Sequence, residues 1–433
     1  MAEAWTNWAG NARCEPFAIE RPASEEELVA VVERAAAGGR RVKVVGAGHS
    51  FTDIACTDGH LVDLARASRV VRVDRERAQV TVQAGIELRK LNRELARVGL
   101  ALENLGDIAY QSVAGATQTA THGTGLRFGN LSSQIVGMRI VTGSGEVMAC
   151  SAEENPEVFH AARVGVGALG AVSEITLQCV PAFNLHAVEE PMRVDEVLGA
   201  LDDHVEGNDH FEFFWVPHTN WALTKSNRRT DEPASPRPRW QAVRDDLLYT
   251  NVLFGALCRL GRRRPSLAAG LGRRIPSSGR VEYVERSDRV FASPRYVHFH
   301  EMEYAVPREA LAEAVQRVRN LVRDAQIPLL FPVEVRVVAG DDIPLSTAHG
   351  RETGYVAVHV YRNSPFDQYF TGVEAIMSDY GGRPHWGKMH FQRADTLAPL
   401  YPEWGRVQEV RARLDPEGRF ANAYLDRVLG PIG

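Results

Sequence analysis

The sequence has few cysteines, and none of them forms a C-x-x-C pair. The five are scattered along 433 residues: Cys14, Cys56, Cys150, Cys179 and Cys258. An odd, scattered set argues against a disulfide framework and against a thiolate zinc site. It favours a reducing compartment.

Long apolar runs are also missing. No run reaches the ~18 residues that a membrane-spanning helix needs, and the best candidate, residues 247–260, is followed by arginines. The first residues read M-A-E-A-W-T-N-W and have neither the basic nor the apolar region of a signal peptide. We therefore expect no integral membrane segment and a cytoplasmic location.

Charge of one sign is not in excess. Charged residues make up 24% of the chain, hydrophobic residues 44%, and the net charge is −5. These values are those of an ordinary globular protein and give no support to a nucleic-acid partner. A length of 433 residues predicts two or three domains.

Two kinds of pattern divide the chain near residue 181. Residues 16–180 alternate between short strands and helices, with a capped helix beginning after Ser24, a helix over 159–169 and a strand over 173–180. The later part predicts antiparallel strands over 210–216, 297–304, 329–338 and 355–361, with a helix over 309–325. We predict an α+β protein with domains at 1–181 and 182–410 and a C-terminal segment, 411–433, that returns to the first domain.

Residues 226–295 lack a clear period and are rich in proline and arginine. A basic patch is expected from Arg259, Arg262, Arg263, Arg264, Arg273 and Arg274. A solvated or oligomer-facing surface is the favoured interpretation, and the role of the segment is left open.

A strand at Val42–Val45 ends in the turn G-A-G, followed by His49. Such a turn lets backbone N–H groups approach an anion, usually a phosphate. A dinucleotide fingerprint would need a third glycine and a helix, but Phe51 occupies the third position and no helical pattern follows. A nicotinamide dehydrogenase is therefore disfavoured, while a simple tight turn with a surface histidine remains an alternative.

Small residues dominate a second stretch, from Gly106 to Gly125. It contains S-V-A-G-A-T-Q-T-A-T-H-G-T-G over 112–125. Such density indicates either a bulky ligand against the backbone or a small-residue helix packed on a sheet.

Two late motifs carry polar chemistry. In E-V-R, a period of two directs Glu334 and Arg336 to one face of a strand, as a structural ion pair or as a polar clamp for a hydroxylated ligand. In H-W-G-K, Lys388 follows His385 closely and suits the stabilisation of a developing anion. No histidine spacing matches a zinc pattern, so we expect no metal.

Taken in order, V-G-A-G-H-S-F, the 112–125 stretch, E-V-R and H-W-G-K resemble the motifs of the aldonolactone and alditol oxidoreductases, which belong to the vanillyl-alcohol oxidase superfamily. The resemblance covers nearly the whole chain. It implies an FAD-binding domain of two α+β subdomains and a substrate-binding cap with an antiparallel sheet. It also implies FAD linked covalently to His49, with Glu334, Arg336 and Lys388 as catalytic residues. The cofactor contacts that it implies are Val45, Gly46, Ala47, Gly48, His49, Ser50, Gly106, Ser112, Gly115, Thr119, Thr121, His122, Val172 and His385.

The resemblance leaves the substrate and the electron acceptor open. A sugar lactone is favoured, an alditol oxidase that produces hydrogen peroxide is the alternative, and a non-catalytic carbohydrate-binding flavoprotein is a distant one. Glycine at position 106 leaves access to the flavin open, which favours oxygen as the acceptor over another oxidant.

Overall fold

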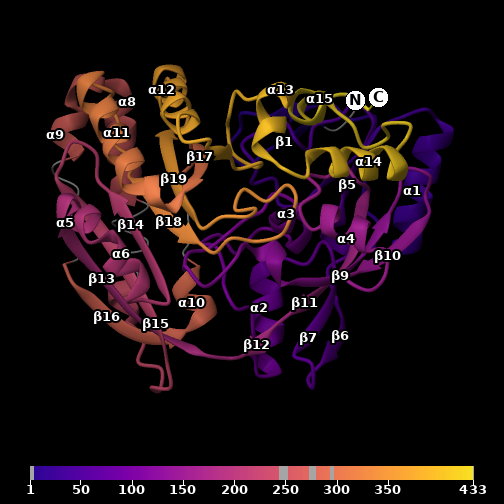
Figure 1. The fold of residues 1–433 in the computed structure, drawn as a ribbon, viewed down its shortest axis with the longest axis horizontal. Helices are drawn as coiled ribbons and strands as arrows, with labels where there is room; N and C mark the ends of the chain where they lie inside the picture. The colour runs from indigo at the N-terminus through magenta and orange to yellow at the C-terminus, as the bar shows by residue number, and fades with distance from the viewer. Residues whose placement is uncertain (1–3, 243–251, 273–278, 293–296, 433) are drawn as a thin grey trace.

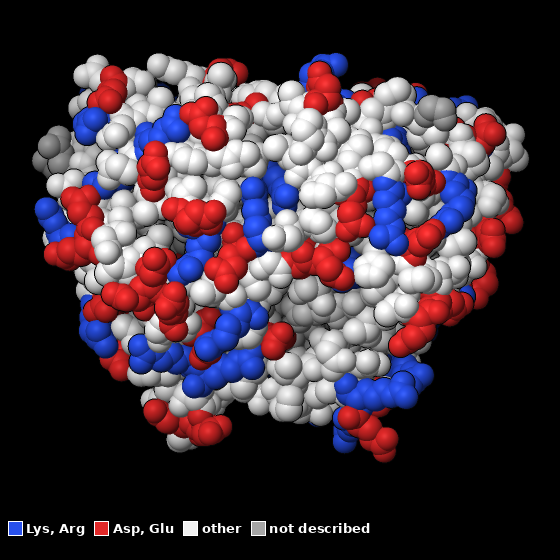
Figure 2. Space-filling model, viewed as in Figure 1, with Lys and Arg blue, Asp and Glu red and all other residues white. Residues whose placement is uncertain are grey.

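The computed structural model describes residues 4–242, 252–272, 279–292 and 297–432. Figure 1 shows two halves side by side, with the N-terminal strands in one and a large sheet in the other. Both termini lie in the same half, because the last helices return to it. Figure 2 shows acidic and basic side chains interspersed over this view, in accord with the modest net charge.

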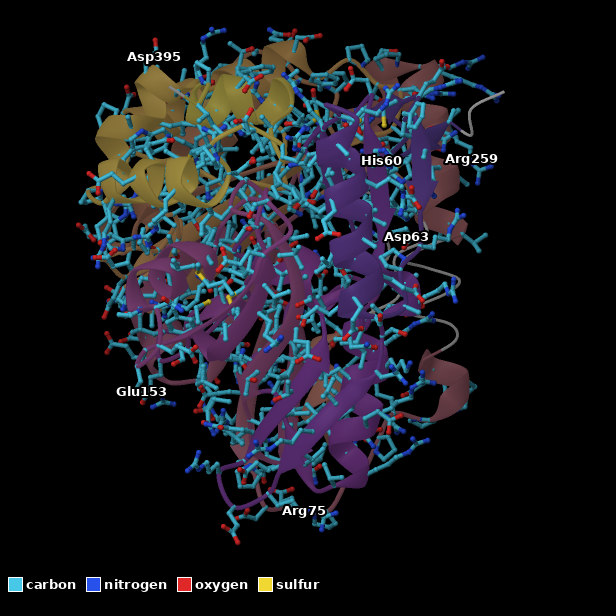
Figure 3. The ribbon with its side chains drawn as sticks, turned by 90° about the vertical axis from the view of Figure 1, so that its right-hand side faces the viewer. His60, Asp63, Arg75, Glu153, Arg259 and Asp395 are labelled. Atoms are coloured by element: carbon cyan, nitrogen blue, oxygen red, sulfur yellow. The ribbon has the colours of Figure 1, made fainter. Side chains whose placement is uncertain are left out.

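The first subdomain is a parallel sheet in the order β3-β5-β4. Its strands are β3 (Ala18–Glu20), β4 (Val42–Val45) and β5 (His60–Asp63), and Figure 3 shows β5 between the labelled His60 and Asp63. Between β3 and β4 runs α1 (Glu25–Ala37), capped by Ser24, whose Oγ accepts a hydrogen bond from Glu27 N at 3.3 Å. The predicted capped helix is confirmed, and it covers the sheet that delivers the turn after Val45.

The second subdomain is a five-stranded antiparallel sheet in the order β10-β9-β11-β7-β6. Its strands are β6 (Val70–Asp74), β7 (Gln79–Gln83), β9 (Ile135–Val141), β10 (Val147–Ser151) and β11 (Ala171–Gln178). Its helices are α2 (Leu88–Arg97), α3 (Val113–Thr117) and α4 (Pro156–Ala162). The predicted helix over 159–169 is wrong after Ala162, because Val166 and Gly167 take positive φ values. The following strand begins at Ala171 rather than at residue 173.

The cap is built on an eight-stranded antiparallel sheet in the order β16-β13-β15-β14-β18-β19-β17-β20. Its strands are β13 (Asn184–Arg193), β14 (His210–Trp215), β15 (Trp221–Thr230), β16 (Val281–Arg286), β17 (Phe299–Pro307), β18 (Val333–Val338), β19 (Thr353–Tyr361) and β20 (Arg383–Pro384). The expected antiparallel sheet is confirmed. The strand predicted over 329–338 begins only at Val333.

The two faces of this sheet differ sharply in polarity. On one face, Val335, Met302 and Val358 pack with residues of α11 (Leu311–Asp324) and α12 (Asp367–Ser378) in one apolar cluster. The alternate positions of β14, β17, β18 and β19 carry Glu212, Glu301, Glu303, Glu334, Arg336 and His359, all buried. Because strand side chains alternate, every one of these polar groups is on the face away from the helices.

Residues 226–295 are more regular than the sequence indicated. Among the described residues they hold the end of β15, all of β16, and α7 (Arg239–Ala242), α8 (Phe254–Arg263), α9 (Ala268–Gly272) and α10 (Ser287–Phe291). The prediction of an irregular segment is therefore wrong, since β16 pairs with β13 despite the proline-rich surroundings. Arg273 and Arg274 lie outside the described residues.

Short elements connect these layers. Two ribbons are formed by β1 (Trp5–Thr6) with β2 (Arg13–Cys14) and by β8 (Leu100–Ala101) with β12 (Val180–Pro181). Further helices are α5 (Val194–Gly199), α6 (Leu201–Glu206), η1 (Leu64–Arg66), η2 (Leu131–Gln134), η4 (Pro265–Leu267), η5 (Arg308–Ala310) and η6 (Ala398–Leu400). Within the described ranges, no helix has the length and hydropathy required to cross a bilayer.

The C-terminal helices α13 (Ala394–Leu397), α14 (Trp404–Leu414) and α15 (Ala423–Leu429) pack into the core of the first half. Val42 N donates to Arg419 O at 2.7 Å, and Lys43 Nζ donates to Phe420 O at 3.1 Å. The domain limits at residues 181 and 410 stay predictions, while these contacts tie the last segment to β4.

Asn422 is the principal connection of this segment. Its Nδ2 contacts the carbonyl oxygens of Asp53, Ile54 and Cys56 at 2.9 to 3.1 Å, and its Oδ1 caps α15 by accepting from Leu425 N at 2.9 Å. The side chain is buried. It therefore fixes the loop after the G-A-G turn to the C-terminal helix.

The substitution Asn422→Ala is expected to lower the free energy of unfolding by about 2–4 kcal/mol, because it removes a helix cap and leaves buried carbonyls unpaired. Urea unfolding followed by circular dichroism measures this change. Asn184→Ala is the control, because its amide donates only to the carbonyl of Glu232 at an exposed position. Equal effects of the two substitutions would refute the role given to Asn422.

Candidate active site

The turn after β4 lines a cavity of about 920 Å³, a volume that includes space open to solvent. Among the residues around it are Val45, Gly46, Ala47, Gly48, His49, Ser50, Ser112, Gly115, Thr119 and Val172. All ten belong to the cofactor contacts that the sequence predicts. The loop after α4, which the sequence had wrongly predicted to be helical, also lines this cavity. Its lining residues are Val166, Gly167 and Gly170.

The glycines of the turn are required by close packing. A Cβ at Gly46 would lie 2.2 Å from Ser112 Oγ, and Gly48 has a φ of +68°, in the left-handed region. The two small-residue stretches therefore pack on each other and also expose backbone to the cavity. Both alternatives offered by the sequence, a ligand site and a small-residue packing surface, are present in one place.

A second cavity of about 720 Å³ adjoins the first and shares His49, Ser50, Gln111 and Thr119 with it. Its other predicted lining residues are Gly106, Thr121, His122, Glu334, Arg336, His385 and Lys388. The four sequence motifs thus converge on two connected chambers. In Figure 1, α3 lies near the middle of the view, on the side of the first half that is toward the cap strand β18.

Hydrogen bonds across the two halves fix this convergence. Phe51 N donates to Gly387 O at 2.7 Å, which joins the first motif to the last. The indole of Trp386 is buried in the core of the first half and donates to Leu345 O at 2.7 Å. With Trp386 anchored there, its neighbours His385 and Lys388 line the second cavity.

Arg336 is held between two carboxylates on the polar face of the cap sheet. Its Nη2 lies 2.5 Å from Glu334 Oε1, and its Nε donates to Glu212 Oε2 at 2.6 Å. Burial would lower the pKa of Arg336, but Glu212 and then Glu334 raise it well above its ordinary value. The guanidinium therefore remains charged, and the predicted ion pair of Glu334 with Arg336 is present at the cavity wall.

Lys388 is held by Glu301, to which its ammonium donates a hydrogen bond. Burial would lower the pKa of Lys388, but Glu301 and Glu303 raise it. His359 Nε2 lies 3.4 Å from the same Glu301 carboxylate. A permanent cation thus faces the cavity, fixed by acidic groups on β17.

Sequence reasoning missed Glu212, Glu301, Glu303 and His359. The signal for two of them was present, since H-E-M-E over 300–303 puts Glu301 and Glu303 on one face of a strand. Two neighbouring acids on the polar face of a buried strand require cations nearby. Only the tertiary structure shows that Lys388 pairs with Glu301 and that His122 contacts Glu303.

His122, Glu303 and His385 gather within a distance that would suit a metal ion. Their hydrogen bonds argue for protons instead. His385 Nδ1 accepts from Gly387 N at 3.0 Å, and burial lowers the pKa of this ring to about 4, so a hydrogen occupies Nε2. His122 Nδ1 contacts Gly123 O at 2.9 Å, and its Nε2 lies 3.2 Å from Glu303 Oε1. The expectation of no metal stays a prediction, favoured by these contacts.

His49 lines both chambers and lies next to aromatic rings, a contact that the sequence did not predict. Trp8 stacks on His298 with a centroid separation of 4.3 Å and lies 5.2 Å from the His49 ring. Burial, with Lys388 and His298, lowers the pKa of His49 to about 4. The imidazole is therefore neutral at pH 7 and keeps a nitrogen lone pair for bond formation.

The residues present fit FAD. Two connected chambers suit a ligand with two ends, and the first is walled by turns in which a Cβ has no room. The second chamber is lined by the cations Arg336 and Lys388 and by the neutral ring of His49. The residues to which the resemblance assigns cofactor contacts all line one of the two cavities, and their role as contacts stays a prediction.

Comparisons with known proteins agree with this site. Residues 16–151 match the family described as FAD binding domain, and residues 175–428 match the family described as D-arabinono-1,4-lactone oxidase. The chain is 50% identical over 434 residues to L-gulono-1,4-lactone dehydrogenase of Mycobacterium tuberculosis (strain ATCC 25618 / H37Rv), covering 100% of both chains. It is 36% identical over 430 residues to L-gulonolactone oxidase of Bos taurus, covering 98% of this chain and 97% of the relative.

Solved structures show the fold. A solvent-stable cholesterol oxidase has a TM-score of 0.86 and 19% identity, with 99% of this chain and 98% of that chain covered. A cholesterol oxidase from B. sterolicum has a TM-score of 0.85 and 16% identity, covering 100% and 97%. The expected fold of the vanillyl-alcohol oxidase type is confirmed. With the family match over more than half of its length, the chain belongs to the D-arabinono-1,4-lactone oxidase family of FAD-binding flavoproteins.

Proposed function

We propose that this protein oxidises a sugar lactone of the L-gulono-1,4-lactone or D-arabinono-1,4-lactone type, with FAD bound covalently through His49. Its membership of a family of FAD-dependent aldonolactone oxidoreductases supports the reaction class. The observation that carries the proposal is the shared cavity, which brings His49 together with Glu334, Arg336 and Lys388.

The lining of the second chamber favours a small polyhydroxylated substrate. Six charged side chains line it: Asp107, Glu301, Glu303, Glu334, Arg336 and Lys388. Carboxylates and a guanidinium accept from and donate to hydroxyl groups, whereas an apolar ligand would leave them unpaired. The solved structures with the same fold are named cholesterol oxidases, so the polar lining, rather than the fold, indicates the substrate class.

Each catalytic residue has a distinct role in the proposal. FAD, when bound, supplies the hydride acceptor. Arg336 donates hydrogen bonds to the substrate oxygens, and Glu334 accepts one from the hydroxyl and assists the loss of its proton. Lys388 presents a fixed cation to the negative charge that develops in hydride transfer.

Oxygen is the proposed electron acceptor. The relatives' names differ on this point, since one is a dehydrogenase and another an oxidase. Gly106 lines the second chamber without a side chain. An alditol remains the alternative substrate, and steady-state rates with lactones and with xylitol or sorbitol decide between the two classes.

Acid precipitation tests the covalent link. Flavin is expected to stay in the protein pellet of the wild type and to pass to the supernatant in His49→Ala. His186→Ala is the control, because His186 contacts Glu282 at the exposed edge of the cap. Flavin released from the wild type would refute the link, and a wild type without flavin after reconstitution would refute the whole proposal.

The substitution Lys388→Met removes the cation from the chamber. We expect the rate of flavin reduction by the lactone to fall about 10²–10³-fold, as when an electrostatic stabiliser is lost. Anaerobic stopped-flow absorbance measures it. Lys225→Met is the control, because Lys225 pairs with Glu212 at 3.4 Å but is absent from the lining of this chamber. A rate unchanged in Lys388→Met would exclude the catalytic role.

The substitution Gly106→Ala tests whether oxygen is the electron acceptor. The new Cβ would lie 3.0 Å from His122 O and 3.5 Å from Thr121 Cγ2, which crowds this wall of the chamber. Reoxidation by oxygen is expected to slow about tenfold, equivalent to ~1.4 kcal/mol of barrier, while flavin reduction changes little. An oxygen electrode and stopped-flow give the two rates. Slow reoxidation already in the wild type would indicate another acceptor.

A further inference from the structure

Residues 5–14, here called the N-terminal ribbon, lie against the turn that follows β4. The ribbon pairs β1 with β2 in antiparallel order. The side chain of Asn7 closes its loop, because Asn7 Oδ1 accepts hydrogen bonds from Asn11 N at 3.1 Å and from Ala12 N at 3.0 Å. Asn7 is buried. The loop of the ribbon is therefore fixed by its own side chains.

Three hydrogen bonds join the ribbon to the carbonyl groups of the turn. They run from Trp8 N to Gly48 O at 2.8 Å, from Asn7 Nδ2 to Ser50 O at 2.9 Å and from Asn11 Nδ2 to Phe51 O at 2.8 Å. One of these carbonyls comes directly before His49 in the chain, and another comes directly after it. The ribbon thus holds the backbone on both sides of this histidine.

Close packing leaves little space between the ribbon and the turn. A Cβ at Gly48 would lie 3.2 Å from Trp5 Cζ2 and 3.7 Å from Asn7 Cα. Trp5 also lines the first cavity, next to the turn itself. The ribbon is therefore part of the wall of the expected cofactor site.

The ring of His49 lies beside the half-buried indole of Trp8. Their centroids are 5.2 Å apart and their planes differ by 32°. Trp8 in turn stacks on His298, with a centroid separation of 4.3 Å and an interplanar angle of 9°. His298 Nδ1 donates to Trp8 O at 2.8 Å, because a carbonyl oxygen only accepts. Phe299 of β17 meets the indole at 5.4 Å and 71°. The cap thus fixes the indole, and the indole adjoins the imidazole.

We propose that Trp8 is a positioning residue for His49, and that the N-terminal ribbon orients this imidazole for bond formation with FAD. The inference rests on the proposed covalent link. An imidazole that turns freely about its side-chain bonds seldom presents its nitrogen in a reactive geometry, and a neighbouring ring face restricts this rotation. Trp8 itself lines neither of the two cavities, so it acts through His49.

The bond joins a ring nitrogen of His49 to a methyl carbon of the flavin ring. Each of the two atoms loses a hydrogen as a proton, and the two electrons released reduce the flavin, from which oxygen, the proposed acceptor, takes them. The ring nitrogen needs a free lone pair, and the pKa of about 4 leaves His49 neutral. His49 supplies the lone pair, and Trp8 fixes its direction.

A purely structural role for Trp8 makes a different prediction. If the indole only filled space, leucine would replace most of its apolar bulk. If the flat ring beside His49 is what matters, phenylalanine would replace it and leucine would not. The pair of substitutions Trp8→Leu and Trp8→Phe therefore separates positioning from packing.

The rate of flavin attachment tests the proposal. Full-length protein produced in riboflavin-starved cells is mixed with FAD, and samples are precipitated with acid over time to measure the flavin held in the pellet. In Trp8→Leu the rate is expected to fall about 10–100-fold, because the reacting atoms lose their alignment. In Trp8→Phe it is expected to stay within about threefold of the wild type, because a flat ring is kept.

Non-covalent binding of FAD is measured separately in a His49→Ala background, in which no bond to this residue forms. The Kd from flavin fluorescence is expected to be nearly the same with Trp8 and with Trp8→Leu. Trp221→Leu is the control, because it makes the same substitution on a tryptophan of β15 that is 47% exposed and lines neither cavity. Circular dichroism establishes that each variant is folded.

The outcomes distinguish this inference from the proposed function. Equal attachment rates in the wild type and Trp8→Leu would overturn the inference and leave the covalent link intact. Attachment as slow in Trp8→Phe or Trp221→Leu as in Trp8→Leu would also overturn it, as would a Kd weakened as much as attachment is slowed. Flavin released from the wild type would refute the link, and the inference with it. Attachment slowed in Trp8→Leu alone supports the proposal.

Discussion

The structure depends on the neutralisation of charged side chains buried between its two halves. Glu212, Glu301, Glu303 and Glu334 all lie on the polar face of the cap sheet. Such groups are costly to remove from water unless each has a partner. Arg336 neutralises the acids of β14 and β18, Lys388 neutralises Glu301 of β17, and His122 contacts Glu303 of the same strand.

This requirement couples the cap to the FAD-binding half. His122 belongs to the small-residue stretch of the first half, and Lys388 follows Trp386, whose ring is anchored in the first core. The cap acids therefore contact His122 of the first half and Lys388, which is fixed next to a ring buried in the first core. Pairing of this kind preorganises a site, because the same contacts that hold the halves together also fix the catalytic cations.

The fold and the chemistry are separable in this protein. Cholesterol oxidases share its architecture over nearly the whole chain, at less than a fifth of identical residues. The chamber over the expected cofactor is nevertheless lined here by acids and cations, which suit hydroxyl groups. Similar backbones thus carry different substrates, and the side chains on one sheet face make the distinction. Because the side chains of a strand alternate between the two faces of a sheet, the opposite face of the cap sheet is apolar and packs against α11 and α12.

The sequence by itself determined the local elements. Strand β4, its G-A-G turn and helix α1 follow from short-range patterns, and all the predicted cofactor contacts line the two chambers. These features are local because a turn, a cap or a run of small residues acts through its immediate neighbours. The order of the motifs carried the family resemblance, and the resemblance supplied the list of cofactor contacts, whose role stays a prediction.

The tertiary structure alone decided which charges meet. Glu301 and Lys388 are 87 residues apart, and Arg336 and Glu212 are 124 apart, so no local pattern pairs them. The irregular appearance of 226–295 was misleading for the same reason, since β16 is a strand only because β13 pairs with it. Strand order and buried electrostatics are long-range properties, and a linear sequence does not display them.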